Sequence, residues 1–164
     1  MRNYRMTEMK HFSLDSDLTR NYINGTIPPR LGQLPKLKNL SLIVNRLTGP
    51  IPPEIGNITT LEQLVLEDNL LGGSLPPHLG NLTSLRILAL SANNFTGTIP
   101  DTFGNLKSLN EFKIDGSELS GKIPDFIGNW INITTFLESL RISDLSGSSS
   151  TLPNLQAMKN LTNL

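Results

Sequence analysis

Apolar residues recur along this chain with a period of 24 residues, in four copies that begin at Leu37, Leu61, Leu85 and Leu109. In each copy the apolar residues at the fourth and sixth positions alternate with mostly polar ones, which is typical of a short strand buried on one face. A strand of this length cannot bury its apolar face alone, so successive copies must stack and share one core. The pattern therefore predicts a solenoid with short parallel strands on its concave face and turns with 3-10 segments on its convex side.

Polar and conformationally special residues hold fixed positions after each strand. One position, the Asn slot, is filled in successive copies by Asn21, Asn45, Asn69, Asn93 and finally Ser117. A buried amide side chain can both donate and accept hydrogen bonds where the backbone turns. Ser117 has one donor fewer, so we expect the fourth turn to be looser. A glycine and a proline follow in every copy, as at Gly49 and Pro52, where they suit a positive φ or close approach and aim the next segment.

The spacing Leu-x-x-Leu-x-Leu-x-x-Asn-x-Leu resembles the leucine-rich repeat. Its continuation, x-Gly-x-Ile-Pro-x-x-Leu-Gly-Asn-Leu, is similar to the plant-specific class found in receptor-like kinase ectodomains, and this match covers about residues 21–132. Five segments resemble one branch of that class, the receptor-like serine/threonine kinases with a malectin-like domain after their repeats: residues 21–29, 64–69, 91–97, 121–127 and 140–145. The resemblance implies a right-handed α/β leucine-rich repeat solenoid on the extracellular side of the plasma membrane in a full-length parent.

The repeat pattern divides the chain into four parts. These are a non-repeat start expected to be disordered (1–14), a degenerate first repeat (15–36), four regular repeats (37–132) and an irregular terminal repeat (133–164). In the first repeat Ser16 replaces a strand leucine, and after Asn132 the best strand pattern is displaced by four residues from the period. Neither end supplies the polar cap that stacked repeats need, so we expect self-association through the uncapped ends.

Charge and composition exclude several classes of function. Lys and Arg total 14, as do Asp and Glu, so there is no basic excess of the kind that binds nucleic acid. The chain has no cysteine, which excludes disulfides and thiolate metal sites, and we predict no metal or cofactor. His78 occupies a variable turn position with no triad partner, and the kinase signatures are absent. We therefore expect no catalysis in this chain, although the parent would by resemblance be a receptor-like serine/threonine kinase.

The chain also lacks the apolar segments that direct proteins to membranes. No stretch approaches the roughly eighteen apolar residues that span a bilayer, and residues 1–12 contain no run typical of a secretory signal. We expect no direct membrane insertion by this segment. The incomplete copies at both ends favour a fragment or truncated product of a longer receptor, and the alternative is a genuinely short intracellular repeat protein.

Seven Asn-x-Ser/Thr sequons occur in the chain. Asn39 should lie on a strand, which makes it a poor acceptor of a glycan. The repeat itself dictates the asparagines at two of the other positions, so their sequons also have a purely structural explanation. The candidates for N-glycosylation in a secreted parent are Asn24, Asn57, Asn81, Asn94, Asn132 and Asn160.

The outward strand positions of a solenoid form one extended concave face. Along this stack the face changes from apolar and neutral to mixed and acidic. We predict that a peptide or protein ligand, or a co-receptor, binds there at Val65, Glu67, Asp68, Ile87, Glu111, Lys113 and Asp115. A solvated sheet face explains any single one of these residues equally well. The leading hypothesis is a recognition module of a plant receptor-like kinase ectodomain; the alternative is a truncated standalone repeat protein that acts as an intracellular scaffold or kinase-less decoy.

Overall fold

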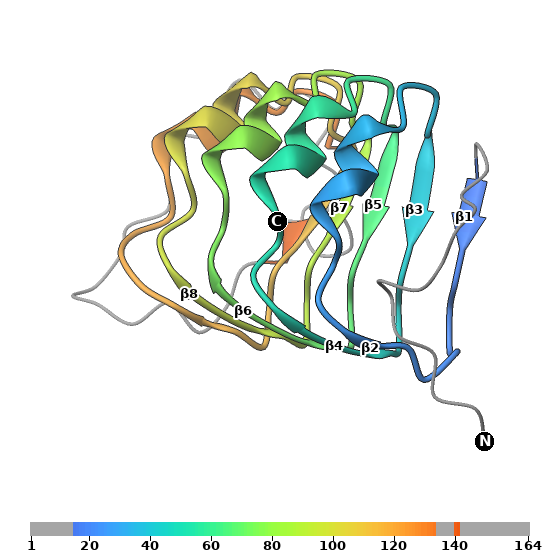
Figure 1. Cartoon of the computed structure of the whole chain (residues 1–164). Coiled ribbons are helices and arrows are strands. Elements are labelled where there is room, and N and C mark those ends of the chain that lie inside the picture. Colours follow the sequence, from blue (N-terminus) through green and yellow to red (C-terminus); the bar gives the residue numbers. More distant parts are fainter. Residues whose placement is uncertain (1–14, 134–139, 142–164) are drawn as a thin grey trace.

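The molecule is a stack of similar coils, seen from the side in Figure 1. This computed structural model describes residues 15–133 and 140–141. A regular coil contributes one strand to a large sheet, one short strand to a second sheet and one 3-10 helix. The predictions made for residues 1–14, for Asn160 and for most of the terminal repeat lie outside the described residues.

Six short parallel strands form the large sheet, in the spatial order β1-β3-β5-β7-β9-β11. Their bounds are Asp15–Asp17 (β1), Asn39–Ser41 (β3), Gln63–Val65 (β5), Ile87–Ala89 (β7), Glu111–Lys113 (β9) and Leu140–Arg141 (β11). The register repeats the sequence period, because Leu64 lies opposite both Leu40 and Leu88. These three leucines are buried and form one row of the core.

The two outer strands of this sheet depart from the regular repeat in different ways. Ser16 of β1 lies opposite Leu40, so the degenerate first repeat still pairs at the regular spacing of 24 residues. Leu140 of β11 lies opposite Phe112, a spacing of 28 residues. The chain between β9 and β11 is therefore four residues longer than a regular coil.

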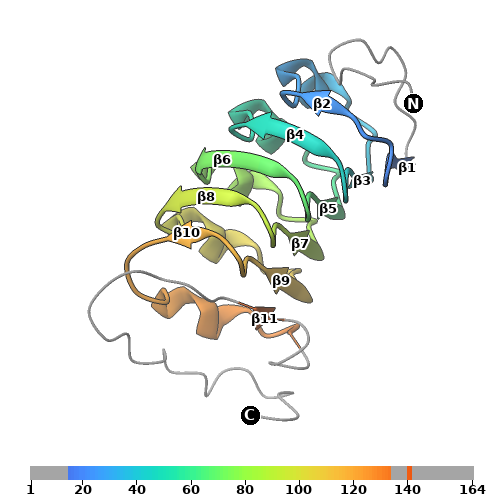
Figure 2. The same ribbon diagram turned by 90° about the horizontal axis from the view of Figure 1, so that it is seen from below.

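A second parallel sheet follows the turn at the end of each large-sheet strand, in the order β10-β8-β6-β4-β2. Its strands are Asn24–Gly25 (β2), Arg46–Gly49 (β4), Leu70–Ser74 (β6), Asn94–Gly97 (β8) and Glu118–Leu119 (β10). Figure 2 shows the two sheets as separate rows of strands along the stack. The sequence analysis did not predict this sheet, because each strand buries at most one side chain, such as Leu71 or Phe95, and so shows no alternation.

A row of 3-10 helices closes the coils. They span Pro29–Gln33 (η2), Pro53–Asn57 (η3), Pro77–Asn81 (η4), Asp101–Asn105 (η5) and Asp125–Asn129 (η6). Each starts after a proline, as at Pro52 with φ −63°, which presets the entry of the chain. A Cβ added to Gly56 in η3 would lie 2.2 Å from the carbonyl oxygen of His78 in η4. Glycine is therefore needed here for close contact between neighbouring helices.

Leucine and isoleucine side chains fill the interior of the coils, and aromatic rings replace them toward the last coil. The ring of Phe112 packs edge-on against Phe103 and Trp130, with centroid distances of 6.4 and 5.0 Å. The Trp130 indole Nε1 donates a hydrogen bond to the Phe103 carbonyl oxygen at 3.2 Å. Burying one such ring contributes about 2 kcal/mol, so this cluster anchors the end of the described stack.

These observations confirm the predicted solenoid of short parallel strands with 3-10 segments. Within residues 15–133, the helical elements of this α/β fold are short 3-10 helices, one to a coil. The large sheet is thus left with one face toward the core and one face uncovered by any helix in the described part of the chain.

Candidate functional site

The Asn slot fixes the turn that follows each strand of the large sheet. The Asn69 side chain Oδ1 accepts a hydrogen bond from the Leu47 N–H at 3.0 Å in the preceding coil. Its Nδ2 donates to the carbonyl oxygens of Leu42 at 2.9 Å and Leu66 at 3.1 Å. Asn45 and Asn93 make the equivalent contacts one coil earlier and one coil later. These buried amides join neighbouring coils and hold the edge of the strand face in place.

The first and last occupants of this slot are bonded differently. Asn21 is exposed, and its Nδ2 donates to the Thr19 carbonyl oxygen at 3.0 Å within its own turn. Ser117 is buried, and its Oγ donates to the Asn93 carbonyl oxygen at 3.3 Å. The slot therefore supplies inter-coil amide bonds in the middle of the stack, where the candidate binding residues lie.

The residue before the Asn slot adopts the left-handed conformation in each coil. The φ angle is 56° at Val44, 55° at Asp68 and 54° at Ala92. The sequence analysis placed Asp68 among the outward strand positions, whereas the structure places it in the corner turn, three residues after β5 ends at Val65. The reason is that the chain must turn sharply so that Asn69 points inward. The exposed Asp68 therefore borders the strand face at its edge.

Of the other predicted binding residues, Val65, Ile87, Glu111 and Lys113 lie in rows across the large sheet, and Glu67 and Asp115 each follow two residues after a strand ends. Gln63, Ile87 and Glu111 stand side by side in one row, and Val65, Ala89 and Lys113 stand in the next. Val65, Ile87, Glu111 and Lys113 are half-buried. They thus form a surface with apolar side chains on β5 and β7 beside charged side chains on β9.

Carboxylates surround a single ammonium group on this part of the face. Lys113 Nζ lies 2.5 Å from Glu111 Oε1, and Ser91 Oγ donates to Asp115 Oδ1 at 2.5 Å. Burial raises the pKa of Glu67, the negative charges of Asp68, Glu111 and Asp115 raise it further, and Lys113 opposes the shift. Acidic charge therefore accumulates around β5, β7 and β9 without full compensation.

The face near β3 has a different chemistry. The outward residues there are Asn39, Ser41 and Ile43, none of which is charged. Ser41 Oγ shares a hydrogen bond with Thr19 Oγ1 at 3.2 Å. The sequence-based expectation of a change from neutral to acidic along the stack thus corresponds to a change between β3 and β9 in the structure.

The described candidate glycosylation sites lie on other surfaces. Asn57, Asn81 and Asn94 are exposed, the first two at the ends of η3 and η4 and the third at the start of β8. Asn132 is exposed, and its Nδ2 donates to the Lys107 carbonyl oxygen at 2.8 Å. Asn24 is half-buried in β2. None of these five residues belongs to β5, β7 or β9.

Two grooves were not predicted from the sequence. One of about 620 Å³ lies between the last two coils and includes Ile99, Lys122 and Phe126 in its walls. The other, of about 500 Å³, includes Glu62, Arg86 and Asn132. Both are lined by equivalent repeat positions of successive coils, such as Thr98 and Lys122 in the first and Glu62, Arg86 and Asn110 in the second. The residue type at these positions differs from coil to coil, so the repeat pattern does not signal the grooves.

Within the described ranges, no three His, Cys, Asp or Glu side chains are grouped in a way that could hold a metal ion. The same ranges contain no helix with the length and apolar character needed to cross a membrane.

Comparison with known proteins agrees with this architecture. A model of the Leucine Rich Repeat family matches residues 36–58, 60–82 and 84–106. A chain of the BIR3–SERK2 complex from Arabidopsis thaliana is 30% identical, with a TM-score of 0.71, and the match covers 85% of this chain and 72% of that one. The chain belongs to the leucine-rich repeat family. Comparison with curated protein sequences gives no match.

Two longer receptors from Arabidopsis are similar in fold. The ectodomain of the membrane receptor kinase GASSHO1/SCHENGEN3, in complex with CASPARIAN STRIP INTEGRITY FACTOR 2, is 33% identical with a TM-score of 0.83, and the match covers 90% of this chain and 17% of that one. The ectodomain of the receptor kinase HAESA, in complex with an IDA peptide hormone, is 30% identical with a TM-score of 0.79, covering 90% of this chain and 24% of that one. The chain therefore spans less than a quarter of either receptor ectodomain. The predicted resemblance to plant leucine-rich repeat receptor ectodomains is confirmed.

Proposed function

We propose that this chain is a peptide- or protein-recognition module from the extracellular part of a plant receptor-like kinase. The observation that carries the proposal is the uncovered face of β5, β7 and β9, where half-buried Val65 and Ile87 lie among charged groups. Partly buried apolar side chains beside fixed charges suit recognition, because apolar contact supplies affinity and charge supplies specificity. The two receptors described above bind a named factor and a peptide hormone, which supports a ligand of the same kind here.

The charge of the face narrows the chemistry of this ligand. Glu67, Asp68, Glu111 and Asp115 carry four negative charges, and Lys113 supplies one positive charge among them. A ligand with a basic group gains Coulomb attraction from this excess, whereas an acidic ligand is repelled. We therefore assign to this face a peptide, or a segment of a co-receptor, that presents a basic side chain beside an apolar one.

The finer placement within the receptor class rests on the sequence. The five segments noted above support the branch with a malectin-like domain, a kinase in the full-length parent and a location on the extracellular side of the plasma membrane. The exposed sequons at Asn57, Asn81 and Asn94 are compatible with secretion. The alternative, a standalone intracellular scaffold or decoy, gains no support from the comparisons. Native transcripts that continue after Leu164 into a transmembrane segment and a kinase reading frame would distinguish the two.

Titration calorimetry tests the binding proposal directly. The purified chain is titrated with synthetic peptides of matched length that contain basic and apolar, acidic and apolar, or only neutral residues. We expect the basic peptides to bind with a Kd in the micromolar range and the acidic ones not to bind. Lys113→Glu adds negative charge to the face and should tighten binding of the basic peptides, whereas Glu111→Lys should abolish it.

His78→Ala is the matched control, because His78 is exposed on η4, outside both sheets. This variant should bind as the unmodified chain does, and all variants should melt at similar temperatures. Equal binding by the Lys113→Glu and Glu111→Lys variants would place the site elsewhere on the molecule. Absence of binding by every peptide class would refute the recognition proposal for this segment.

A further inference from the structure

One corner of the stack, where the large sheet turns into the second sheet, carries exposed apolar side chains in three successive coils. Tyr22, Val44 and Leu70 are 44%, 39% and 54% exposed. In the described part of the chain, Ile131 is the one other large hydrophobic residue so exposed, at 53%, and it lies after η6. Exposed apolar side chains gathered in one place mark an interaction surface, whereas isolated ones need no explanation.

The fold does not require apolar residues at this corner. The position of Val44 in the repeat is filled by Arg20, Asp68, Ala92 and Gly116 in the other coils. The position shared by Tyr22 and Leu70 is filled by Arg46, Asn94 and Glu118 in the other coils. Because polar residues serve the same backbone positions elsewhere in the stack, packing within the chain does not account for Tyr22, Val44 and Leu70.

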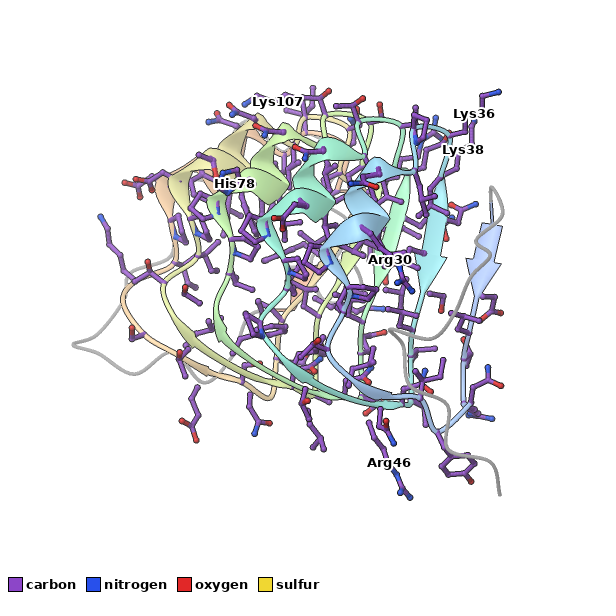
Figure 3. All side chains as sticks on the ribbon, viewed as in Figure 1. Arg30, Lys36, Lys38, Arg46, His78 and Lys107 are labelled. Carbon is purple, nitrogen blue, oxygen red and sulfur yellow. The ribbon has the colours of Figure 1, made fainter. Side chains whose placement is uncertain are left out.

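Charges of opposite sign lie along the same corner. The Arg46 guanidinium sits 5.4 Å from the centroid of the Tyr22 ring. Figure 3 shows Arg46 at the lower edge of the stack, with its side chain directed away from the ribbon. Asp68 is exposed one coil further along the stack. We name this surface the corner strip, and it consists of Arg20, Tyr22, Val44, Arg46, Asp68 and Leu70.

We infer that the corner strip is a homodimer interface, which pairs with the corner strip of a second copy of this chain around a two-fold axis. A two-fold interface must be complementary to itself. When a second strip runs in the opposite direction, Arg46 of each copy faces Asp68 of the other. Val44 of each copy then faces Leu70 of the other, and Tyr22, one coil further out, adds an aromatic surface of the type enriched in interfaces.

The size of the strip indicates a weak dimer. Neighbouring strands are about 4.8 Å apart, so three coils give a strip of roughly 10–15 Å in length. Contacts of this size belong to the low end of specific interfaces and bind in the micromolar range. The corner strip shares Asp68 with the proposed ligand face and otherwise lies beside it, so dimerisation is measured without added peptide.

Charge reversal tests the inference by sedimentation velocity over about 5–200 µM protein. Because Asn94 lies at the same corner and begins a sequon, the chain is produced without N-glycosylation. The unmodified chain should show a concentration-dependent monomer–dimer equilibrium. Arg46→Glu and Asp68→Arg should each weaken dimerisation at least about tenfold, since each places like charges opposite each other twice. An equimolar mixture of the two variants, and the double variant, should dimerise within about threefold of the unmodified chain.

Ile131→Glu removes the exposed apolar residue outside the strip and should leave the dimer unchanged. Circular dichroism melting of every variant separates loss of the dimer from loss of the fold. A monomer at all concentrations would overturn the inference, as would unchanged dimerisation of Arg46→Glu. Oligomers whose mass keeps rising with concentration would also overturn it, because they indicate stacking through the uncapped ends rather than a closed pair.

Discussion

The turns at Asn45, Asn69 and Asn93 differ from the turn at Ser117 in how they are bonded to the neighbouring coil. Each asparagine accepts a backbone N–H from the preceding coil and donates to carbonyl oxygens of both coils. Ser117 is equally buried, yet its hydroxyl donates one long hydrogen bond of 3.3 Å. One chain thus contains both the amide-bonded and the hydroxyl-bonded form of the same turn, which allows the contribution of the amide to be measured.

The largest effect is expected for Asn69→Ala. This change removes four hydrogen bonds and leaves the Leu47 N–H and the carbonyl oxygens of Leu42, Leu66 and Glu67 without that side chain. Uncompensated buried backbone groups are costly, so the free energy of unfolding should fall by about 3 kcal/mol, measured by urea denaturation. Asn110→Ala, at an exposed residue, should change it by less than about 0.5 kcal/mol. Similar losses in both variants would contradict a special role for the slot.

Replacing Ser117 with asparagine should convert the fourth turn into the form of the first three. By the spacing seen at Asn93, the new amide would accept from the Phe95 N–H and donate to the carbonyls of Leu90 and Ile114. The free energy of unfolding should rise by about 1 kcal/mol, read as a higher urea midpoint at an unchanged slope. Slower hydrogen exchange of the Phe95 amide would show that the added stability arises at this turn. A lower midpoint would show that this turn no longer accommodates an amide.

Ser117→Ala should have a smaller effect than either change above. It removes one hydroxyl and one hydrogen bond of 3.3 Å to the Asn93 carbonyl oxygen. We expect the free energy of unfolding to fall by no more than about 1 kcal/mol, by the same denaturation measurement. A loss as large as that of Asn69→Ala would mean that serine and asparagine are equivalent in this slot.

The smallest predicted effect concerns the carboxylate of Glu67, which lies two residues before Asn69. Burial raises the pKa of Glu67 above its ordinary value of 4.5, so the folded chain holds this proton more tightly than the unfolded chain. The stability that Glu67 contributes is therefore present at low pH and is lost as the pH rises from 4.5 through the raised pKa.

Glu67→Gln should remove this pH dependence and raise the free energy of unfolding near pH 7 by about 0.5 kcal/mol, a small amount because solvent screens a half-exposed group. Urea denaturation of both proteins at several values of pH measures the difference. If the variant were less stable than the unmodified chain at pH 7, the folded chain would instead stabilise the ionised form of Glu67.

Part of the architecture follows directly from the sequence, because it depends on strong periodic signals. The leucines at the fourth and sixth positions specify the large sheet, and the prolines before the 3-10 helices specify where these begin. The second sheet could not be predicted, because strands such as Glu118–Leu119 are too short to show an alternating pattern. They form through pairing with neighbouring coils, which is a property of the stack and not of one segment.

The candidate binding residues also fall into two groups, those whose position the sequence predicts and those whose position it does not. The period predicts that Val65, Ile87, Glu111 and Lys113 point outward from strands, and the structure places them on β5, β7 and β9. The position of Asp68 in the turn depends on the left-handed conformation before Asn69, which no residue type signals, since Val44 and Ala92 adopt it too. The raised pKa of Glu67 comes first from burial and then from the charges of four side chains on β9 and in the turns of different coils, which no local sequence pattern specifies.

The 3-10 helices do not pack equally closely along the solenoid. A Cβ on Gly56 or Gly80 would lie 2.2 or 2.4 Å from a carbonyl oxygen of the next helix, whereas one on Gly104 would first meet the Phe126 side chain at 3.1 Å. The rear wall is therefore tightly closed through η5 and opens at the step to η6, beside the 620 Å³ groove. The convex wall of the solenoid is thus looser between η5 and η6 than between the earlier helices, and a side chain rather than backbone fills the space beside Gly104.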